Sequence, residues 1–179
     1  MVRFTNKPIG ILGGSFDPAH KGHLAISNIA IKKIKLSKVL WIVTNQNPFK
    51  AKPFYSLSQR IAKAKKITKK TKIIKVVHLD KAIRSTRSIN VVNHLINKKK
   101  LKNLYFIIGS DNLIKFHKWK SWKKLVKLTK LVVFSRKGYD RKSKKSIVAK
   151  YLKNKIIFIS NKPIKISSTI LREKAKVNN

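Results

Sequence analysis

The sequence predicts an α/β fold, with one parallel β-sheet covered by helices on both faces, in a single domain spanning residues 1–179. Three observations lead to this prediction. Short apolar runs alternate along the chain with segments whose apolar residues recur three and four positions apart. The apolar runs are almost continuous, which is typical of strands buried on both faces. Finally, 179 residues with 42% hydrophobic content suffice for one complete core, and no linker or internal repeat divides the chain.

The elements are expected in the following order. The first strand covers residues 8–12 and ends in a glycine turn at Gly13 and Gly14, after which a helix runs from residue 22 to about residue 35. Further strands are expected at residues 38–44, 72–79, 103–108, 131–135 and 156–160. Further helices are expected at residues 56–70, where Ser56 and Gln59 form a capping-box pattern, and at residues 89–99, 146–152 and in the tail 166–176. Loops are expected at residues 45–55, 80–88 and 136–145, and a tryptophan-rich stretch lies at residues 116–128.

The net charge is extreme, because 45 basic side chains face only five acidic ones and leave +40. Such a charge is typical of nucleic-acid-binding proteins. Here the lysines are spread over the whole length, and only seven of the basic residues are arginine, the residue suited to bidentate recognition of bases and phosphates. Abundant Ile, Lys and Asn together are also what an AT-rich genome produces. We therefore expect at most non-specific nucleic-acid binding, and keep a basic nucleic-acid-binding protein as the alternative from another class.

The composition also limits the chemistry and the location. Without cysteine, the chain has no disulfide, thiol nucleophile or cysteine metal site. Five acidic residues argue against mechanisms that need carboxylate pairs or carboxylate metal cages. No apolar run is long enough to span a membrane, and the first residues lack the apolar core of a signal peptide, so we expect a cytoplasmic protein.

Residues 9–24, IGILGGSFDPAHKGHL, carry the most specific pattern. An apolar run, two glycines and a helix start follow one another, and glycine lets the backbone approach a bulky ligand closely. The N–H groups and positive dipole end of the helix attract an anion. His20 and His23 are three residues apart at the helix start, so both imidazoles can donate hydrogen bonds to a phosphate. The pattern predicts a phosphate site, although HxGH alone fits a tight turn with two surface histidines about as well.

A second glycine turn is expected at Gly109, where another strand ends and Ser110, Asp111 and Asn112 follow. Ligands of parallel α/β sheets bind outside the carboxyl ends of the strands, at the switch point of the strand order. The turns at residues 13–14 and 109 should therefore converge on one crevice.

The tail segment ISSTILR, residues 166–172, is a further candidate for phosphate binding. Ser167 or Ser168 is the expected N-cap of a helix, and hydroxyl and N–H groups there can hold phosphate together with Thr169. Arg172 follows in the first turn and can add a bidentate grip. Alone, the segment fits an ordinary N-cap with a surface arginine; together with HxGH, it favours a second phosphate site.

Four blocks together resemble the bacterial nicotinate-nucleotide adenylyltransferases of the HxGH nucleotidyltransferase superfamily. They are GGSFDPAHKGHL, NPFK at 47–50, IIGSDNLIKFHKW at 107–119 and ISSTILR at 166–172. The resemblance spans nearly the whole chain and implies a Rossmann-like, doubly wound sheet. It implies that ATP and nicotinate mononucleotide are converted to deamido-NAD and pyrophosphate in NAD biosynthesis. Mg²⁺ is the expected cofactor, bound mainly through substrate phosphates and not by a metal site of the protein.

The resemblance also implies roles for individual residues. His20, His23 and Arg172 would be catalytic, with His23 stabilising the α-phosphate of ATP in the transition state. Asp111 would contact the ATP ribose, and Trp119 would stack on the pyridine ring. The implied ATP site comprises Gly13, Gly14, Ser15, Phe16, Gly22, Gly109, Asp111, Ser167, Ser168 and Thr169, and the implied nicotinate-nucleotide site comprises Lys50, Thr86, Arg87 and Trp119.

One loop departs from the family pattern. A Tyr-Thr pair is common there, whereas this chain has Thr86-Arg87-Ser88. The resemblance implies that this loop helps to recognise the nicotinate carboxylate, so selectivity between acid and amide stays open, with backbone N–H groups and Arg87 as candidates. Nicotinamide-mononucleotide and pantetheine-phosphate adenylyltransferase remain alternatives, although the Trp119 block and ISSTILR favour a pyridine nucleotide. Whether the chain forms a homo-oligomer is also open.

Overall fold

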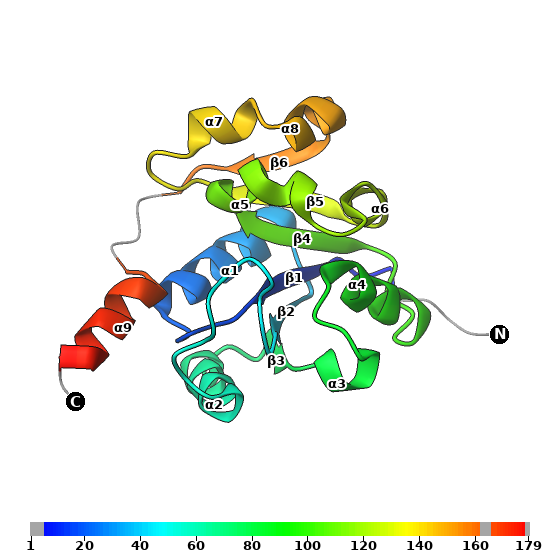
Figure 1. Cartoon of the computed structure of the whole chain (residues 1–179). Coiled ribbons are helices and arrows are strands. Elements are labelled where there is room, and N and C mark those ends of the chain that lie inside the picture. Colours follow the sequence, from blue (N-terminus) through cyan, green and yellow to red (C-terminus); the bar gives the residue numbers. More distant parts are fainter. Residues whose placement is uncertain (1–5, 162–165, 178–179) are drawn as a thin grey trace.

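The computed structural model describes residues 6–161 and 166–177 of the chain (Figure 1). Six parallel strands form one sheet in the order β3-β2-β1-β4-β5-β6. The strands are β1 (Ile9–Gly14), β2 (Lys38–Val43), β3 (Ile74–Val77), β4 (Leu104–Gly109), β5 (Lys130–Phe134) and β6 (Ile156–Ile159). The strand order reverses between β1 and β4, which places the switch point at their carboxyl ends. The predicted doubly wound parallel sheet is confirmed.

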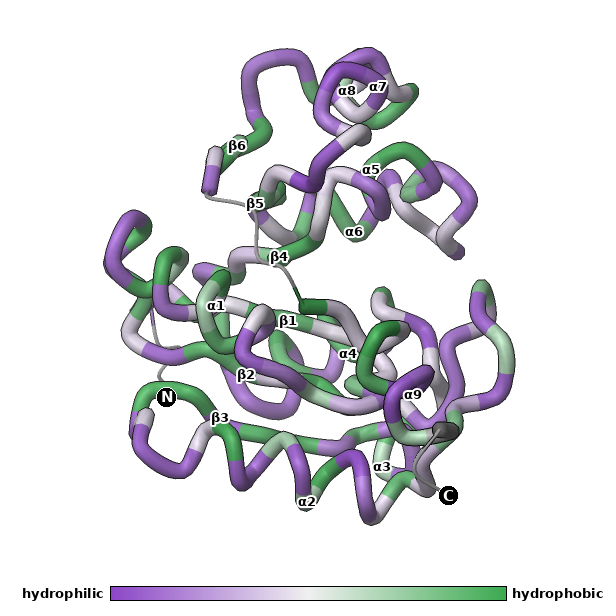
Figure 2. Tube along the Cα trace, turned by 90° about the vertical axis from the view of Figure 1, so that its left-hand side faces the viewer, coloured by the Kyte–Doolittle hydropathy of each residue, from purple (hydrophilic) through white to green (hydrophobic). Residues whose placement is uncertain are grey.

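Helices cover both faces of this sheet. One face carries α1 (Lys21–Ile34) and α2 (Leu57–Thr68), and the other carries α4 (Ser88–Asn97), α5 (Ser110–Lys115), α6 (Trp122–Leu128) and α8 (Ile147–Leu152). Neighbouring strand residues contribute to opposite cores: Ile11 packs with the α4 side and Leu12 with the α1 side. Both faces are therefore buried, which explains why the strands are almost continuously apolar. Figure 2 shows that hydrophilic and hydrophobic residues alternate along α2, as in a helix with one side on the core and the other toward solvent.

Two predicted loops contain short helices, which corrects the sequence-based expectation. α3 (Asp80–Ile83) lies within residues 80–88, and α7 (Asp140–Lys144) lies within residues 136–145. Each begins with an aspartate, whose negative charge is favourable in a first helical turn. The tryptophan-rich stretch divides into the 3₁₀ helix η1 (Phe116–Lys118) and α6, and η2 (Lys153–Lys155) precedes β6. The predicted capping box of Ser56 and Gln59 is present.

The predicted glycine turns are also wrong in detail. Gly13 and Gly14 are the last residues of β1 and pair with Ile42 and Val43 of β2, so neighbouring strands hold them extended. Gly109 likewise ends β4, and α5 begins at the next residue. The chain turns only after β1, at residues 15–19, where Phe16 has a φ of 48°.

α9 (Ser168–Val177) lies beside the start of α1, although about 150 residues separate them in sequence (Figure 1). This contact brings the tail to the carboxyl edge of the sheet, as predicted. Across the described residues, none of the helices combines the length and the apolar character needed to cross a membrane.

Candidate active site

His20 and His23 cap the start of α1 reciprocally. The Gly22 N–H donates to His20 Nδ1 at 3.1 Å, and the His20 backbone N–H donates to His23 Nδ1 at 3.3 Å. Both Nδ1 atoms are acceptors, so in the neutral imidazoles the protons lie on Nε2. The ring centroids are 3.9 Å apart. The predicted juxtaposition of the two histidines is therefore present, and it provides two neighbouring Nε2–H donors.

The surroundings keep both imidazoles uncharged. Burial, and to a smaller extent the Arg136 cation, lower the pKa of His20 to about 4. Burial lowers the pKa of His23 to about 3, with further contributions from His20, Arg136 and Lys50. Both pKa values lie far below the ordinary 6.5, so each ring donates one Nε2–H at neutral pH.

Aromatic packing fixes the orientation of His23. Phe16 lies 4.9 Å from the His23 ring and stacks on Trp41 at 5.0 Å. The Trp41 indole N–H donates to Ser27 Oγ, which in turn donates to the His23 carbonyl. Phe16 is 3% exposed, so its side chain supports the histidine, and a contact with ATP would have to involve the Phe16 backbone.

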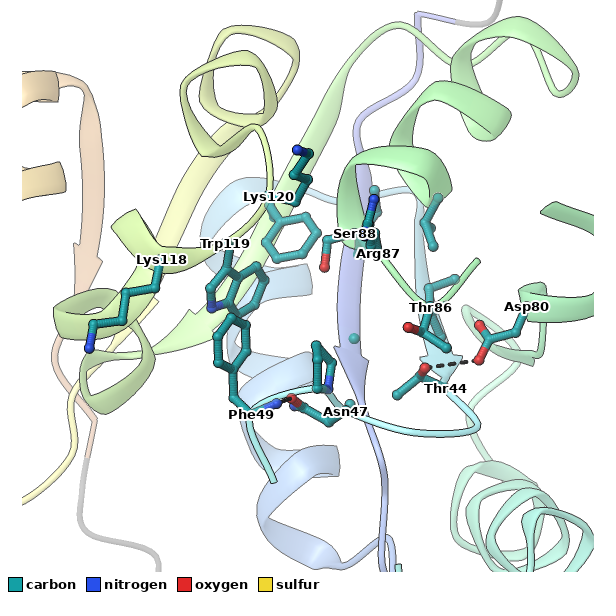
Figure 3. A pocket seen from close by; sticks show the side chains of 17 residues that line it. Thr44, Asn47, Phe49, Asp80, Thr86, Arg87, Ser88, Lys118, Trp119 and Lys120 are labelled. Carbon is teal, nitrogen blue, oxygen red and sulfur yellow. Dashed lines mark hydrogen bonds between the residues drawn. The ribbon is translucent and has the colours of Figure 1, made fainter. Parts of the chain in front are cut away.

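A cavity of about 240 Å³ lies at the same edge of the sheet (Figure 3). The expected nicotinate-site residues Thr86, Arg87 and Trp119 line it, whereas Lys50 does not. The preceding residues Asn47, Pro48 and Phe49 line it instead. The Phe49 ring lies nearly parallel to the Trp119 ring, with 6.5 Å between the ring centroids. Figure 3 shows Phe49 and Trp119 on one side and Thr44, Thr86 and Asp80 on the other. The cavity therefore has an aromatic wall opposite a polar one.

Glycines shape two parts of this edge. Gly13 lines the cavity, and a Cβ added there would meet no protein atom within 4 Å, so a larger side chain would project into the open space. At Gly109, a Cβ would collide with Asp111 Oδ1 and lie 3.1 Å from Arg136 Nε. Glycine at residue 109 lets the Asp111 carboxylate and the Arg136 guanidinium approach each other, with 3.4 Å between Oδ1 and Nε.

Asp111 and Arg136 thus form an ion pair near the histidines. Asp111 lies in the first turn of α5 and is not its N-cap, which is Gly109. The Arg136 side chain is about half exposed, and its charge influences both His20 and His23. Sequence reasoning missed Arg136. A signal was present, because Arg136 is one of only seven arginines in a lysine-rich chain and follows closely after a strand.

The ISSTILR segment binds the turn that precedes α1. Ser167 Oγ accepts from the Ile170 N–H and caps α9, and Ser168 Oγ donates to the Pro18 carbonyl at 3.0 Å. Arg172 Nη1 donates to the Asp17 carbonyl at 2.8 Å and lies 3.7 Å from Asp17 Oδ2. Arg172 falls in the second turn of α9 and not in the first. Its Nη2 donates to Thr169 Oγ1, so the segment is near the histidines, but its polar groups hold the turn in this structure.

Two buried acidic residues complete the site, and sequence reasoning gave neither a structural role. Asp17 accepts hydrogen bonds from the Phe54 and Tyr55 N–H groups, and Asp80 accepts from the Asn45 N–H and Thr44 Oγ1. The two carboxylates thereby hold the two ends of the loop that carries Phe49.

Comparison with known proteins identifies the family. The cytidylyltransferase-like family model matches residues 11–174. The protein named “Probable nicotinate-nucleotide adenylyltransferase” in Pelagibacter ubique is 48% identical over 166 residues, which cover 92% of each chain. The chain belongs to the nicotinate-nucleotide adenylyltransferase family. A second relative with this name, from Clostridium acetobutylicum, is 31% identical over 180 residues, covering 96% of this chain and 88% of the relative.

A solved structure agrees with this adenylyltransferase family at the level of fold. The Plasmodium falciparum nicotinic acid mononucleotide adenylyltransferase complexed with NaAD superimposes with a TM-score of 0.75. It covers 94% of this chain and 83% of its own, at 19% sequence identity. The fold of the adenylyltransferase family is therefore shared across nearly the whole described chain.

Proposed function

We propose that this protein transfers the adenylyl group of ATP to nicotinate mononucleotide, forming deamido-NAD and releasing pyrophosphate. The observation that carries the proposal is the pair of neutral histidines beside an aromatic-walled cavity at the switch point. One loop serves both parts, because Phe49 lines the cavity and the next residue, Lys50, acts electrostatically on His23. The names of the relatives, which span most of the chain, support the same reaction.

In this reaction the phosphate oxygen of nicotinate mononucleotide attacks the α-phosphorus of ATP in line. The new oxygen–phosphorus bond forms as the bond to pyrophosphate breaks, so the protein needs no covalent intermediate. The Nε2–H groups of His20 and His23 would donate to the α-phosphate oxygens as their charge grows. Arg136 and Lys50 add positive potential at the same place. Arg172 would join them through a rotation away from Asp17.

The cavity would take the pyridine end of the acceptor. Trp119 offers a ring face for stacking, with Phe49 beside it. Across from them, Arg87 is the N-cap of α4 and makes no side-chain capping hydrogen bond, so the first N–H groups of this helix can bind the nicotinate carboxylate. The exposed Arg87 guanidinium adds a positive charge next to them. We propose that this combination favours the acid over the amide.

Mg²⁺ would enter with the nucleotide. Among the side chains that the structure describes, no three His, Cys, Asp or Glu residues gather in a way that could hold a metal. We propose that the ion is held mainly by phosphate oxygens and water, since the chain has only five acidic residues to offer as ligands. When bound, the ion would neutralise charge on the β- and γ-phosphates.

A panel of acceptors tests the proposal. The purified protein with ATP and Mg²⁺ should release pyrophosphate fastest with nicotinate mononucleotide, more slowly with nicotinamide mononucleotide, and not with phosphopantetheine. Turnover with phosphopantetheine and with neither pyridine nucleotide would assign the cavity to a different acceptor.

A further inference from the structure

We propose that Arg60 is a positioning residue for this reaction. Its side chain fixes the turn after β1 and the loop after β2 relative to each other. The inference rests on the proposed function. It concerns a side chain that does not line the cavity and that carries no role in the expected ATP or nicotinate sites.

The contacts of Arg60 are unusual for an arginine. The side chain is 1% exposed, and its guanidinium donates to four main-chain carbonyls instead of to a carboxylate. The acceptors are Ser15 at 2.6 Å, Thr44 at 2.7 Å, Asn45 at 3.0 Å and Tyr55 at 3.1 Å. These carbonyls come from three separate segments, so one planar group fixes their relative positions.

Asp17 and Asp80 bind backbone N–H groups of the same segments whose carbonyls Arg60 binds. We call the three side chains Arg60, Asp17 and Asp80 the frame. Asp17 accepts from the N–H groups of Phe54 and Tyr55 at 2.8 and 2.9 Å, and Asp80 accepts from the Asn45 N–H at 2.6 Å. Their negative charges also stabilise the buried Arg60 cation. Two of the five acidic residues in a chain of charge +40 thus belong to the frame. Arg60, Asp17 and Asp80 are each more than 90% buried.

The frame bears directly on the site because of what lies between its anchors. Residues 45–55 leave it at Asn45 and return at Tyr55, and between them Phe49 is 53% exposed while it lines the cavity. Inside the loop, Gln46 Nε2 donates to the Lys50 carbonyl at 2.9 Å, so the tip holds its own shape. Its anchors at Asn45 and Tyr55 determine where Phe49 and Lys50 lie relative to the sheet. Ser15, the remaining anchor, begins the turn that leads to His20. The carbonyls of Thr44, Asn45 and Tyr55 all lie at the ends of the loop that carries Phe49. Loss of the frame should therefore weaken binding of nicotinate mononucleotide more than binding of ATP.

Arg60→Lys and Arg60→Met test the proposal, with Ile74→Ala as the matched control. Lysine keeps the buried charge but cannot reach four carbonyls with a planar fork. Ile74 is 4% exposed at the amino end of β3 and makes none of the hydrogen bonds of the frame, so its truncation should lower the Tm while those bonds stay in place. The dissociation constant of nicotinate mononucleotide is measured by calorimetry, and KM and kcat are measured for both substrates.

We expect Arg60→Lys to raise the Kd and KM for nicotinate mononucleotide by roughly tenfold to a hundredfold, which corresponds to the loss of about one hydrogen bond to a charged group. The KM for ATP should change by less, and Arg60→Met should bind the acceptor more weakly still. Ile74→Ala should keep the wild-type Kd at its lower Tm. If Arg60→Lys also kept the wild-type Kd and KM and lost only Tm, the residue would be merely structural, and that conclusion would hold even if Arg60→Met did not fold. A wild type that binds the acceptor without transferring the adenylyl group would instead refute the function, while the Kd comparison would still decide on Arg60.

Discussion

The two ring nitrogens of His23 have different tasks, and two substitutions separate them. Nδ1 accepts the His20 N–H and so caps α1, whereas the proton on Nε2 is the proposed donor to the α-phosphate. His23→Asn places an amide oxygen where Nδ1 accepts, but has nothing at Nε2. His23→Gln reaches the Nε2 position with an amide N–H, but loses the acceptor at Nδ1. The first substitution should therefore spare the fold and the second should spare the chemistry.

The magnitudes follow from these contacts. Loss of one preorganised donor at developing charge lowers kcat by about 10²–10³-fold, so His23→Asn should show this loss with nearly wild-type stability. Loss of a cap costs about 0.5–2 kcal/mol of unfolding free energy, which His23→Gln should show while retaining more of kcat than the Asn variant. His23→Ala should show both losses. The weakening of ATP binding should be smaller than the loss in kcat for each variant.

Steady-state kinetics and urea unfolding on the same preparations check this separation. His94→Asn and His94→Gln serve as controls, because His94 lies in the last turn of α4, outside the site. Nearly wild-type kcat in His23→Asn would contradict donation from Nε2 to the α-phosphate and would leave the histidines with a capping role alone. Equal loss of kcat in the Asn and Gln variants would mean that Nε2 is not the group that matters.

Three further predictions follow from the site and the surface. The pKa values of His20 and His23 in the folded state lie below 6.5, so below pH 6.5 the unfolded chain binds more protons than the folded one. Each histidine should therefore lower the unfolding free energy by about 1–1.5 kcal/mol at pH 5.5 relative to neutral pH. Urea titrations should show that a variant with both histidines replaced by Asn loses much of this pH dependence. Arg87→Ala should shrink the preference for nicotinate over nicotinamide mononucleotide in kcat/KM by harming the acid, since a charge-assisted hydrogen bond is worth roughly 1.5–3 kcal/mol; equal harm to both substrates would move the selectivity element elsewhere. Binding to DNA should weaken steeply with salt and hardly vary with base sequence, and a preference of about 10³ or more at physiological salt would revive a nucleic-acid function.

Sequence patterns predicted the sheet and the histidine pair because both depend on local rules. Strands buried on both faces must be apolar at nearly every position, and histidines three apart at a helix start must share a side of it. Gly13 and Gly14 were assigned to a turn for the same local reason. Their extended conformation comes from pairing with β2, about 30 residues away, which no local pattern reveals.

The parts that were missed depend on distant partners. Arg60 occupies one position of an amphipathic helix among many lysines, and only the fold brings the carbonyls of Ser15 and Thr44 to it. Asp80 stood in what was expected to be a polar loop, and its buried hydrogen bonds reach back to the end of β2. Such polar contacts across strand ends form only after the parallel sheet has placed its carboxyl ends together.

The most direct measurement of adenylyl transfer follows the phosphorus atoms of ATP. ATP labelled at the α-phosphate is incubated with the protein, Mg²⁺ and nicotinate mononucleotide, and the products are separated. The reaction proposed for this site places the α-label in deamido-NAD, whereas label at the β-position appears in pyrophosphate. An α-label that stays with free AMP, or that enters phosphopantetheine and neither pyridine nucleotide, would contradict adenylyl transfer to nicotinate mononucleotide.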